Sequence, residues 1–126
     1  MIEQLGLSQN VKLTGNVDNV ADYLYTSDVF VLCSKYEGVS LALLEAAATG
    51  LPLIVTSTGG TPEIVKDDAI LVPDDNPKEL SDAMLLLAND CEKYNMYCMR
   101  SVNIAKRYSL EKMVATYYCY YKEKRK

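Results

Sequence analysis

The sequence predicts an α/β fold, in which a parallel sheet carries helices on both of its faces. Short apolar runs of strand length, such as residues 53–55, alternate with segments in which apolar residues recur at helical spacing. Short loops with turn-forming residues join these segments. Strands that alternate with helices build parallel sheets, because each crossover helix returns the chain to the start of the next strand.

Four segments are expected to be strands: residues 11–13, 29–33, 53–55 and 69–72. The second is a continuous apolar run, typical of a strand that is covered on both faces, and it places Cys33 in that strand. A turn signal follows the first run at residues 14–16, and another follows the fourth at residues 73–75.

The helices are expected at residues 18–25, residues 40–49, a short segment that opens at Thr61, a segment that opens at Asn76, residues 91–107 and residues 109–124. Asp18, Ser40 and Thr61 are the predicted N-caps of the first three, because short polar side chains can accept from the free N–H groups of a first turn. Gly50 and Pro52 end the second helix. No internal repeat or linker interrupts the pattern, so residues 1–126 are predicted to form a single domain.

Composition excludes several classes of function. The net charge is −4, which argues against a nucleic-acid partner, because phosphate binding needs a dense surface of lysine and arginine. The chain has no histidine, so neither a Ser-His-Asp triad nor a histidine-based metal site can form. Its four cysteines lack C-x-x-C spacing and are interpreted as scattered reduced thiols. With no signal peptide and no membrane-spanning run, the expected location is the cytoplasm.

Ligands of such sheets bind outside the carboxyl ends of the strands. Three loops are predicted at that edge: residues 15–17, 35–40 and 56–60. The second is the most informative, since Gly38 lets the backbone come close to a ligand. The helix that follows offers free N–H groups and a partial positive charge. Together these features predict a site for a phosphate or diphosphate.

Two acidic residues flank this predicted anion site. Residues 41–48 are apolar except at Glu45, which predicts a helix buried on every face with one carboxylate that needs a hydrogen-bonding partner. Ribose hydroxyls are one such partner, and a neighbouring loop or a lysine is the alternative. From its position alone, Glu37 is interpreted as an exposed loop acid. Gly59 and Gly60 either make a turn or approach a ligand.

Several spaced motifs resemble one family over residues 5–121. Residues 37–45 look like the E-x7-E motif of retaining glycosyltransferases of family 4 (glycosyl transferases group 1), which have the GT-B fold. Residues 11–15, 46–52 and 58–63 are similar to the family's nucleobase-loop strand, its E-A-x-A-x-G-x-P run and its G-G-x-P-E turn. The resemblance implies a Rossmann-like C-terminal domain that binds the nucleotide sugar.

The resemblance also implies roles for single residues. The acid that matches Glu45 binds the ribose, and the acid that matches Glu37 lies by the hydroxyls of the donor sugar. The backbone of the loop that matches Gly38, Val39, Ser40 and Leu41 contacts the sugar and the diphosphate. Asn16 and Val17 match the loop that lies against the base. No certain catalytic residue, cofactor or metal is implied, and the donor is expected to be a UDP or GDP sugar transferred with retention.

The chain departs from the family in two respects. Val39 and Ser40 stand where the family often has Phe-Gly, which is expected to alter sugar selectivity. In the family, the arginine and lysine that neutralise the diphosphate, and the N-terminal acceptor domain, lie upstream of the residue that matches Met1. We therefore expect a truncated C-terminal domain that binds its donor weakly and is inactive in isolation. The alternatives are a nucleotide-sugar epimerase, a stand-alone nucleotide-binding or interaction module, and the C-terminal half of a split enzyme.

The last predicted helix carries four tyrosines and a basic end. The favoured interpretation is that Tyr117, Tyr118, Tyr120 and Tyr121 pack on this domain or on an N-terminal domain. The alternative is a peripheral contact with a membrane surface, because basic-aromatic helices favour interfaces.

Overall fold

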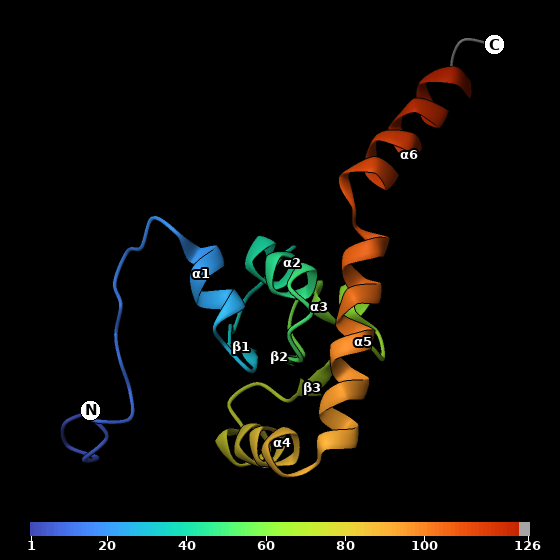
Figure 1. Cartoon of the computed structure of the whole chain (residues 1–126). Helices are drawn as coiled ribbons and strands as arrows, with labels where there is room; N and C mark the ends of the chain where they lie inside the picture. The colour runs from blue at the N-terminus through green and yellow to red at the C-terminus, as the bar shows by residue number, and fades with distance from the viewer. Residues whose placement is uncertain (124–126) are drawn as a thin grey trace.

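The structure is a computed structural model that describes residues 1–123, and its centre is a parallel sheet (Figure 1). The strands β1 (Phe30–Leu32), β2 (Leu53–Thr56) and β3 (Ile70–Val72) lie in the order β1-β2-β3. Phe30 of β1 is in register with Leu53 of β2, and Ile54 of β2 with Ile70 of β3. Sequence neighbours are therefore neighbours in the sheet. Because both pairings are parallel, the loops that follow the strands lie along one edge.

The helices of the described residues are α1 (Val20–Tyr25), α2 (Leu41–Ala48), α3 (Thr61–Val65), α4 (Pro77–Asn89), α5 (Cys91–Arg107) and α6 (Leu110–Glu123). Side chains cap four of them where the sequence offers a short polar residue. Ser40 Oγ accepts from the Leu43 N–H, Asn76 from the Glu79 N–H, Asp90 from the Lys93 N–H and Ser109 from the Lys112 N–H.

Strand β2 forms the core with both of its faces, and all four of its residues are buried. Leu53 and Val55 belong to a cluster with residues of α2, α3 and α5, whereas Ile54 packs with residues of α4 on the other face. Figure 1 shows α2 and α4 on opposite sides of the strands. The predicted parallel sheet with helices on both faces is confirmed.

Helix α5 is tied to the rest of the fold by polar contacts as well as by Ile104, which is fully buried. Arg107 forms an ion pair with Asp68 and donates to the Ile64 carbonyl at 3.2 Å. At the other end of the helix, Tyr94 Oη donates to the Asp28 carbonyl at 3.1 Å, and burial raises the pKa of this phenol. These bonds hold α5 against segments that precede β1 and follow α3.

The predicted strand at residues 11–13 is wrong, because this segment has no regular structure and no partner strand within the described residues. Leu13 is 82% exposed. A short strand is stable only when its backbone groups pair with a neighbour, and apolar composition cannot supply that pairing. Figure 1 shows the segment before α1 running away from the sheet.

The prediction that the helix at residues 41–48 is buried on every face is also wrong. Leu43, Ala46 and Ala47 are buried, but Leu41 is 72% exposed and Glu45 is exposed. The reason is that α2 packs on the sheet and on α5 through one face, while the opposite face has no cover in the described chain.

Three local predictions also need correction. Strand β1 ends at Leu32, and Cys33 is exposed, because the chain leaves the sheet one residue early. Gly60, which has no side chain, takes the N-cap position of α3, and Thr61 is buried in the first turn instead of capping it. Helix α1 begins after Asn19, so Asp18 does not cap it.

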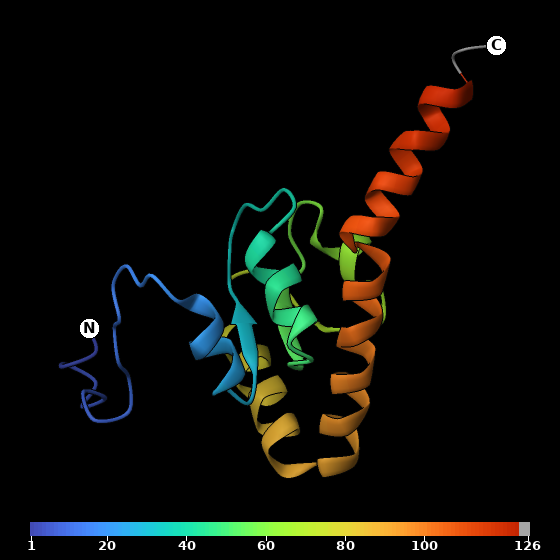
Figure 2. The ribbon, with the colours of Figure 1, turned by 45° about the horizontal axis from the view of Figure 1, so that its top comes forward.

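Helix α6 projects from the body of the molecule (Figure 2) and has no buried residue. Its four tyrosines are 59–72% exposed, so the prediction that they pack on this domain is wrong, and their packing on an N-terminal domain stays a prediction. The predicted helix end at residue 124 and the basic residues 124–126 lie outside the described residues. Among residues 1–123, every helix is too short or too polar to cross a membrane.

The burial of β2 predicts which leucines hold the fold together. Leu53→Ala should lower the free energy of unfolding by about 2–5 kcal/mol, because Leu53 is 0% exposed and its loss leaves a cavity. Leu110→Ala is the matched control, since Leu110 is 66% exposed on α6, and it should change the free energy by less than about 0.5 kcal/mol. Urea unfolding followed by circular dichroism measures both. An equal decrease in the free energy of unfolding for the two variants would contradict this description of the core.

Candidate functional site

The candidate site lies at the carboxyl ends of β1 and β2, where two loops lead into helices α2 and α3. The first loop, residues 33–40, holds most of the predicted ligand-binding residues. The second, residues 57–60, contains the glycine pair. Ligands of open parallel sheets bind at this kind of edge, because strand ends and helix N-termini meet there.

In the first loop, Glu37 is half-buried and its orientation is set by a neighbour. Ser34 Oγ donates to Glu37 Oε1 at 2.8 Å. This bond uses one carboxylate oxygen and leaves the other able to accept from a ligand hydroxyl. Glu37 is therefore held in place, and the interpretation of it as an exposed loop acid is wrong.

The first turn of α2 follows this loop. Ser40 is buried and caps the N–H of Leu43, while an α-helix leaves the N–H groups of its first residues without partners inside the helix. In α2 these belong to Leu41 and Ala42, at the positive end of the helix dipole. Val39 and Leu41 are exposed beside them. The arrangement can accept an anionic group at the surface of the molecule.

Hydrogen bonds to two carbonyl groups of the first loop, those of Ser34 and Glu37, join the two loops. The Ser34 carbonyl accepts from Thr56 Oγ1 at 2.7 Å and from Thr58 Oγ1 at 3.0 Å. The Gly60 N–H donates to the Glu37 carbonyl at 3.3 Å. Residues 34–37 are thus held in place by hydrogen bonds from the end of β2 and the loop after it, as well as by their covalent connection to β1.

The glycine pair makes this contact sterically feasible. A Cβ atom on Gly59 would lie 1.7 Å from the Glu37 carbonyl oxygen, and one on Gly60 would lie 2.9 Å from the Gly38 carbonyl oxygen. Gly59 also has a φ of +53°, a conformation that side chains disfavour. The glycines approach the other loop, which neither sequence interpretation proposed. A pair of glycines does not indicate which segment of the chain packs against it. The contact between the two loops could therefore not be predicted from the sequence.

Glu45 lies on the exposed face of α2, about 6 Å along the helix from Leu41 at a rise of 1.5 Å per residue. It lines a groove of about 280 Å³ between α1 and α2, together with Leu24, Tyr25 and Thr49. Since Glu45 is exposed, the argument that a buried acid must have a partner fails. The carboxylate is instead open to a ligand in the groove.

Asn16 and Val17 are the predicted site residues that the structure does not bring to the loops. They lie in the segment that precedes α1, and Asn16 is exposed. Figure 1 shows this segment leaving the body at the start of α1, which itself flanks the groove beside Glu45. The contact of Asn16 and Val17 with a base stays a prediction.

Comparison with known sequences gives consistent matches. The model of the family described as glycosyl transferases group 1 matches residues 1–90. The chain is 32% identical over 120 residues to an N-acetyl-alpha-D-glucosaminyl L-malate synthase of Bacillus anthracis. The matched region covers 93% of this chain and 32% of the relative. It is 29% identical over 93 residues to the lipopolysaccharide core biosynthesis mannosyltransferase LpsB of Rhizobium meliloti (strain 1021), which covers 71% of this chain and 26% of that protein.

Solved structures resemble the same part of larger molecules. Sucrose-phosphate synthase from Thermosynechococcus elongatus superposes with a TM-score of 0.86 at 23% identity, over 97% of this chain and 32% of that one. Anabaena HepE, solved with UDP and with UDP-glucose, superposes with a TM-score of 0.79 at 23% identity, over 84% of this chain and 30% of that one. The fold is thus that of part of a GT-B glycosyltransferase. The chain spans about a third or less of the length of these relatives.

The contact between the loops can be tested at Gly59. Gly59→Ala should destabilise the protein and move the amide resonances of Glu37 and Gly38, because the new methyl group would meet the Glu37 carbonyl oxygen. Gly50→Ala is the matched control. Gly50 also has a positive φ, +80°, but its nearest side-chain neighbour would be 3.7 Å from the new Cβ atom.

The control should lose about 1–2 kcal/mol from the backbone conformation alone, and Gly59→Ala should lose more. Urea unfolding and amide spectra measure the two effects. Unchanged Glu37 and Gly38 resonances in Gly59→Ala would contradict the contact.

Proposed function

The chain belongs to the glycosyl transferases group 1 family, and from this premise we propose that it forms the donor-binding part of a retaining glycosyltransferase. The donor is a nucleotide diphosphate sugar of the UDP or GDP type. One observation carries the proposal: at the carboxyl edge of the sheet the half-buried Glu37 precedes the first turn of α2, and Glu45 follows on the exposed face of that helix. A ligand with a sugar, a diphosphate and a ribose presents its groups in a matching order.

The diphosphate is placed at the N-terminus of α2. The N–H groups of Leu41 and Ala42, and the backbone between Gly38 and Ser40, supply donors, and the helix dipole supplies a favourable potential. A helix N-terminus can stabilise a leaving diphosphate in the way that a cation does elsewhere. We therefore propose that donor binding requires no divalent metal.

The nucleoside is placed along the groove between α1 and α2. Glu45 is the acid in this groove, and a carboxylate can accept from both hydroxyls of a ribose. Tyr25 is largely exposed and offers an aromatic ring on the α1 side. Asn16 and Val17 precede α1, so the base is proposed to lie toward that end.

The sugar is placed beside Glu37, whose free carboxylate oxygen accepts from a ring hydroxyl. The Ser34 hydroxyl holds the carboxylate in one orientation, and Thr56 and Thr58 hold Ser34. Relatives bear the names of a mannosyltransferase and of a UDP-Gal-dependent galactosyltransferase, and one neighbour was solved with UDP-glucose. These names support a nucleotide diphosphate sugar as the donor of this chain. Which sugar it carries is to be determined by experiment.

Substitution of Glu45 tests the placement of the ribose. Glu45→Gln should weaken binding of UDP or GDP by about tenfold, because the amide keeps an acceptor oxygen but loses the charge that strengthens its hydrogen bond to the ribose. Glu92→Gln is the control, since Glu92 is an exposed helical glutamate in α5. Amide shifts of the labelled chain give both affinities, with EDTA and with magnesium. Equal nucleotide affinity in Glu45→Gln and the unchanged chain would contradict the proposed role of Glu45 in binding the ribose. Nucleotide binding that requires magnesium would contradict the proposal that no divalent metal is needed.

Transfer itself is proposed to need groups beyond the described residues, since the base that activates the acceptor is not assigned to any of them. Incubation of this chain with a panel of UDP and GDP sugars and candidate acceptors should release no nucleotide above background. Addition of the rest of a group 1 glycosyltransferase from the same source should restore release. Turnover by the chain alone would show that the donor-binding part is sufficient.

A further inference from the structure

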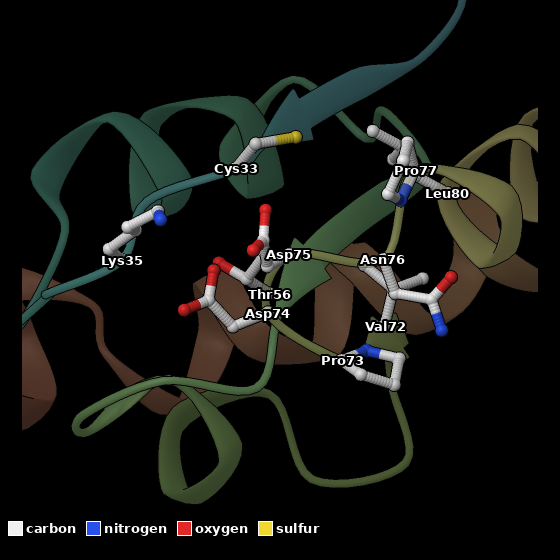
Figure 3. Close-up of a pocket in the computed structure, with 10 residues that line it drawn as sticks. All are labelled: Cys33, Lys35, Thr56, Val72, Pro73, Asp74, Asp75, Asn76, Pro77 and Leu80. Carbon is white, nitrogen blue, oxygen red and sulfur yellow. The ribbon is translucent and has the colours of Figure 1, made fainter.

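A second cavity lies at the same edge of the sheet, on the α4 side. It has a volume of about 240 Å³, and the ends of all three strands contribute to it, through Cys33 after β1, Thr56 in β2 and Val72 in β3. Figure 3 shows its lining residues. This volume is below the range of about 300–1,000 Å³ for pockets that enclose a drug-sized ligand. The size of the cavity suits a single sugar ring.

Three charged side chains reach this cavity from two loops. Figure 3 shows the Lys35 ammonium group, from the loop after β1, and the carboxylates of Asp74 and Asp75, from the loop after β3, directed into the same space. The ion pairs found among residues 1–123 join Lys78 to Asp82 and Arg107 to Asp68. The three charges at the cavity are thus free to bond a ligand.

The remaining wall of the cavity is mostly apolar. Pro73, Pro77 and Leu80 line it, with Val72 at its base. Their C–H surfaces can pack on the C–H face of a sugar ring. Asp75 has a φ of +54°, the left-handed conformation that aspartate tolerates better than most residues, and this conformation fixes the direction in which its side chain leaves the turn.

The charges of the cavity select the chemistry of its ligand. Two carboxylates and one ammonium group give a net charge of −1, which disfavours a phosphate, and the lysine disfavours a metal cation. A neutral ligand with adjacent hydroxyl groups satisfies all three, because carboxylates accept from hydroxyls and the ammonium group donates to their oxygens.

We propose that this cavity, the sheet-edge cavity, is a subsite for one hexose ring, with Asp74, Asp75 and Lys35 bonded to its hydroxyls and Pro73 and Leu80 against its apolar face. The proposal rests on the proposed function, because it extends the sugar-binding surface from Glu37 across the ends of the strands. Lys35 is two residues before Glu37, and Thr56 both lines the cavity and holds Ser34. The ring belongs either to the nucleotide-bound sugar or to an acceptor saccharide.

Amide spectra of the full labelled chain test the proposal with three kinds of probe. The first is a set of methyl glycosides of glucose, galactose, mannose and N-acetylglucosamine at high millimolar concentration. At least one should move the resonances of Lys35, Thr56, Asp75 and Asn76. The other probes are UDP and UDP-glucose, each titrated alone.

The source of the ring follows from these probes. If UDP-glucose moves the cavity resonances and UDP moves only those of residues 37–45, the donor sugar occupies the cavity. If only the free glycosides move them, the occupant is an acceptor saccharide. Both results support the proposal, and a set of glycosides and UDP-glucose that leaves these resonances unmoved overturns it. Failure of UDP to perturb residues 37–45 is a different result, which contradicts the proposed function.

Variants at the cavity provide the second measurement. Asp75→Asn keeps a residue that tolerates the left-handed conformation, and it should weaken glycoside binding about tenfold, because the amide oxygen lacks the charge that strengthens the hydrogen bond to a hydroxyl. Lys35→Met should weaken it as well. Asp67→Asn is the matched control, since Asp67 is an exposed aspartate that precedes β3, on the opposite edge of the sheet. Equal affinity in Asp75→Asn, Lys35→Met and the control would overturn the proposal.

Discussion

The burial of one strand on both faces is the constraint on which the rest of the structure depends. Strand β2 is the central strand and joins the two core clusters, because Leu53 and Val55 face α2 and α5 while Ile54 faces α4. Burial of an apolar side chain contributes roughly 1.5–3 kcal/mol, so this short segment supplies a large part of the driving force. Its position also decides where ligands can bind, since the loops that follow β1 and β2 meet at its carboxyl end.

The candidate site follows from that geometry through a small number of backbone contacts. The Ser34 carbonyl, held by Thr56 and Thr58, links the end of β2 to the loop that carries Glu37. Ser40 then starts α2, which turns the backbone so that free N–H groups and Glu45 share one surface. The residues proposed to bind a sugar, a diphosphate and a ribose are thus ordered by one strand, one loop and two turns of helix.

Sequence reasoning predicted the parts of this arrangement that depend on local pattern. The apolar runs of β1 and β2, the Ser40 cap and the Gly50 stop of α2 are local signals, and the structure confirms them. Exposure of Glu45 and loss of the strand at residues 11–13 depend on what covers a face or pairs with an edge, and local composition does not encode either. The roles of Glu37 and Glu45 came from resemblance to a family, and spacing alone left both open.

The close approach of Gly59 to Glu37 has a consequence for how such a site can diversify. Surface loops usually accept insertions and deletions, which is a common route to new specificities. Here a change of length in either loop would separate two backbones that touch, and the turn at Gly59 would no longer support the loop that carries Glu37. At this edge the geometry therefore favours replacement of side chains such as Val39 over insertions or deletions in either loop.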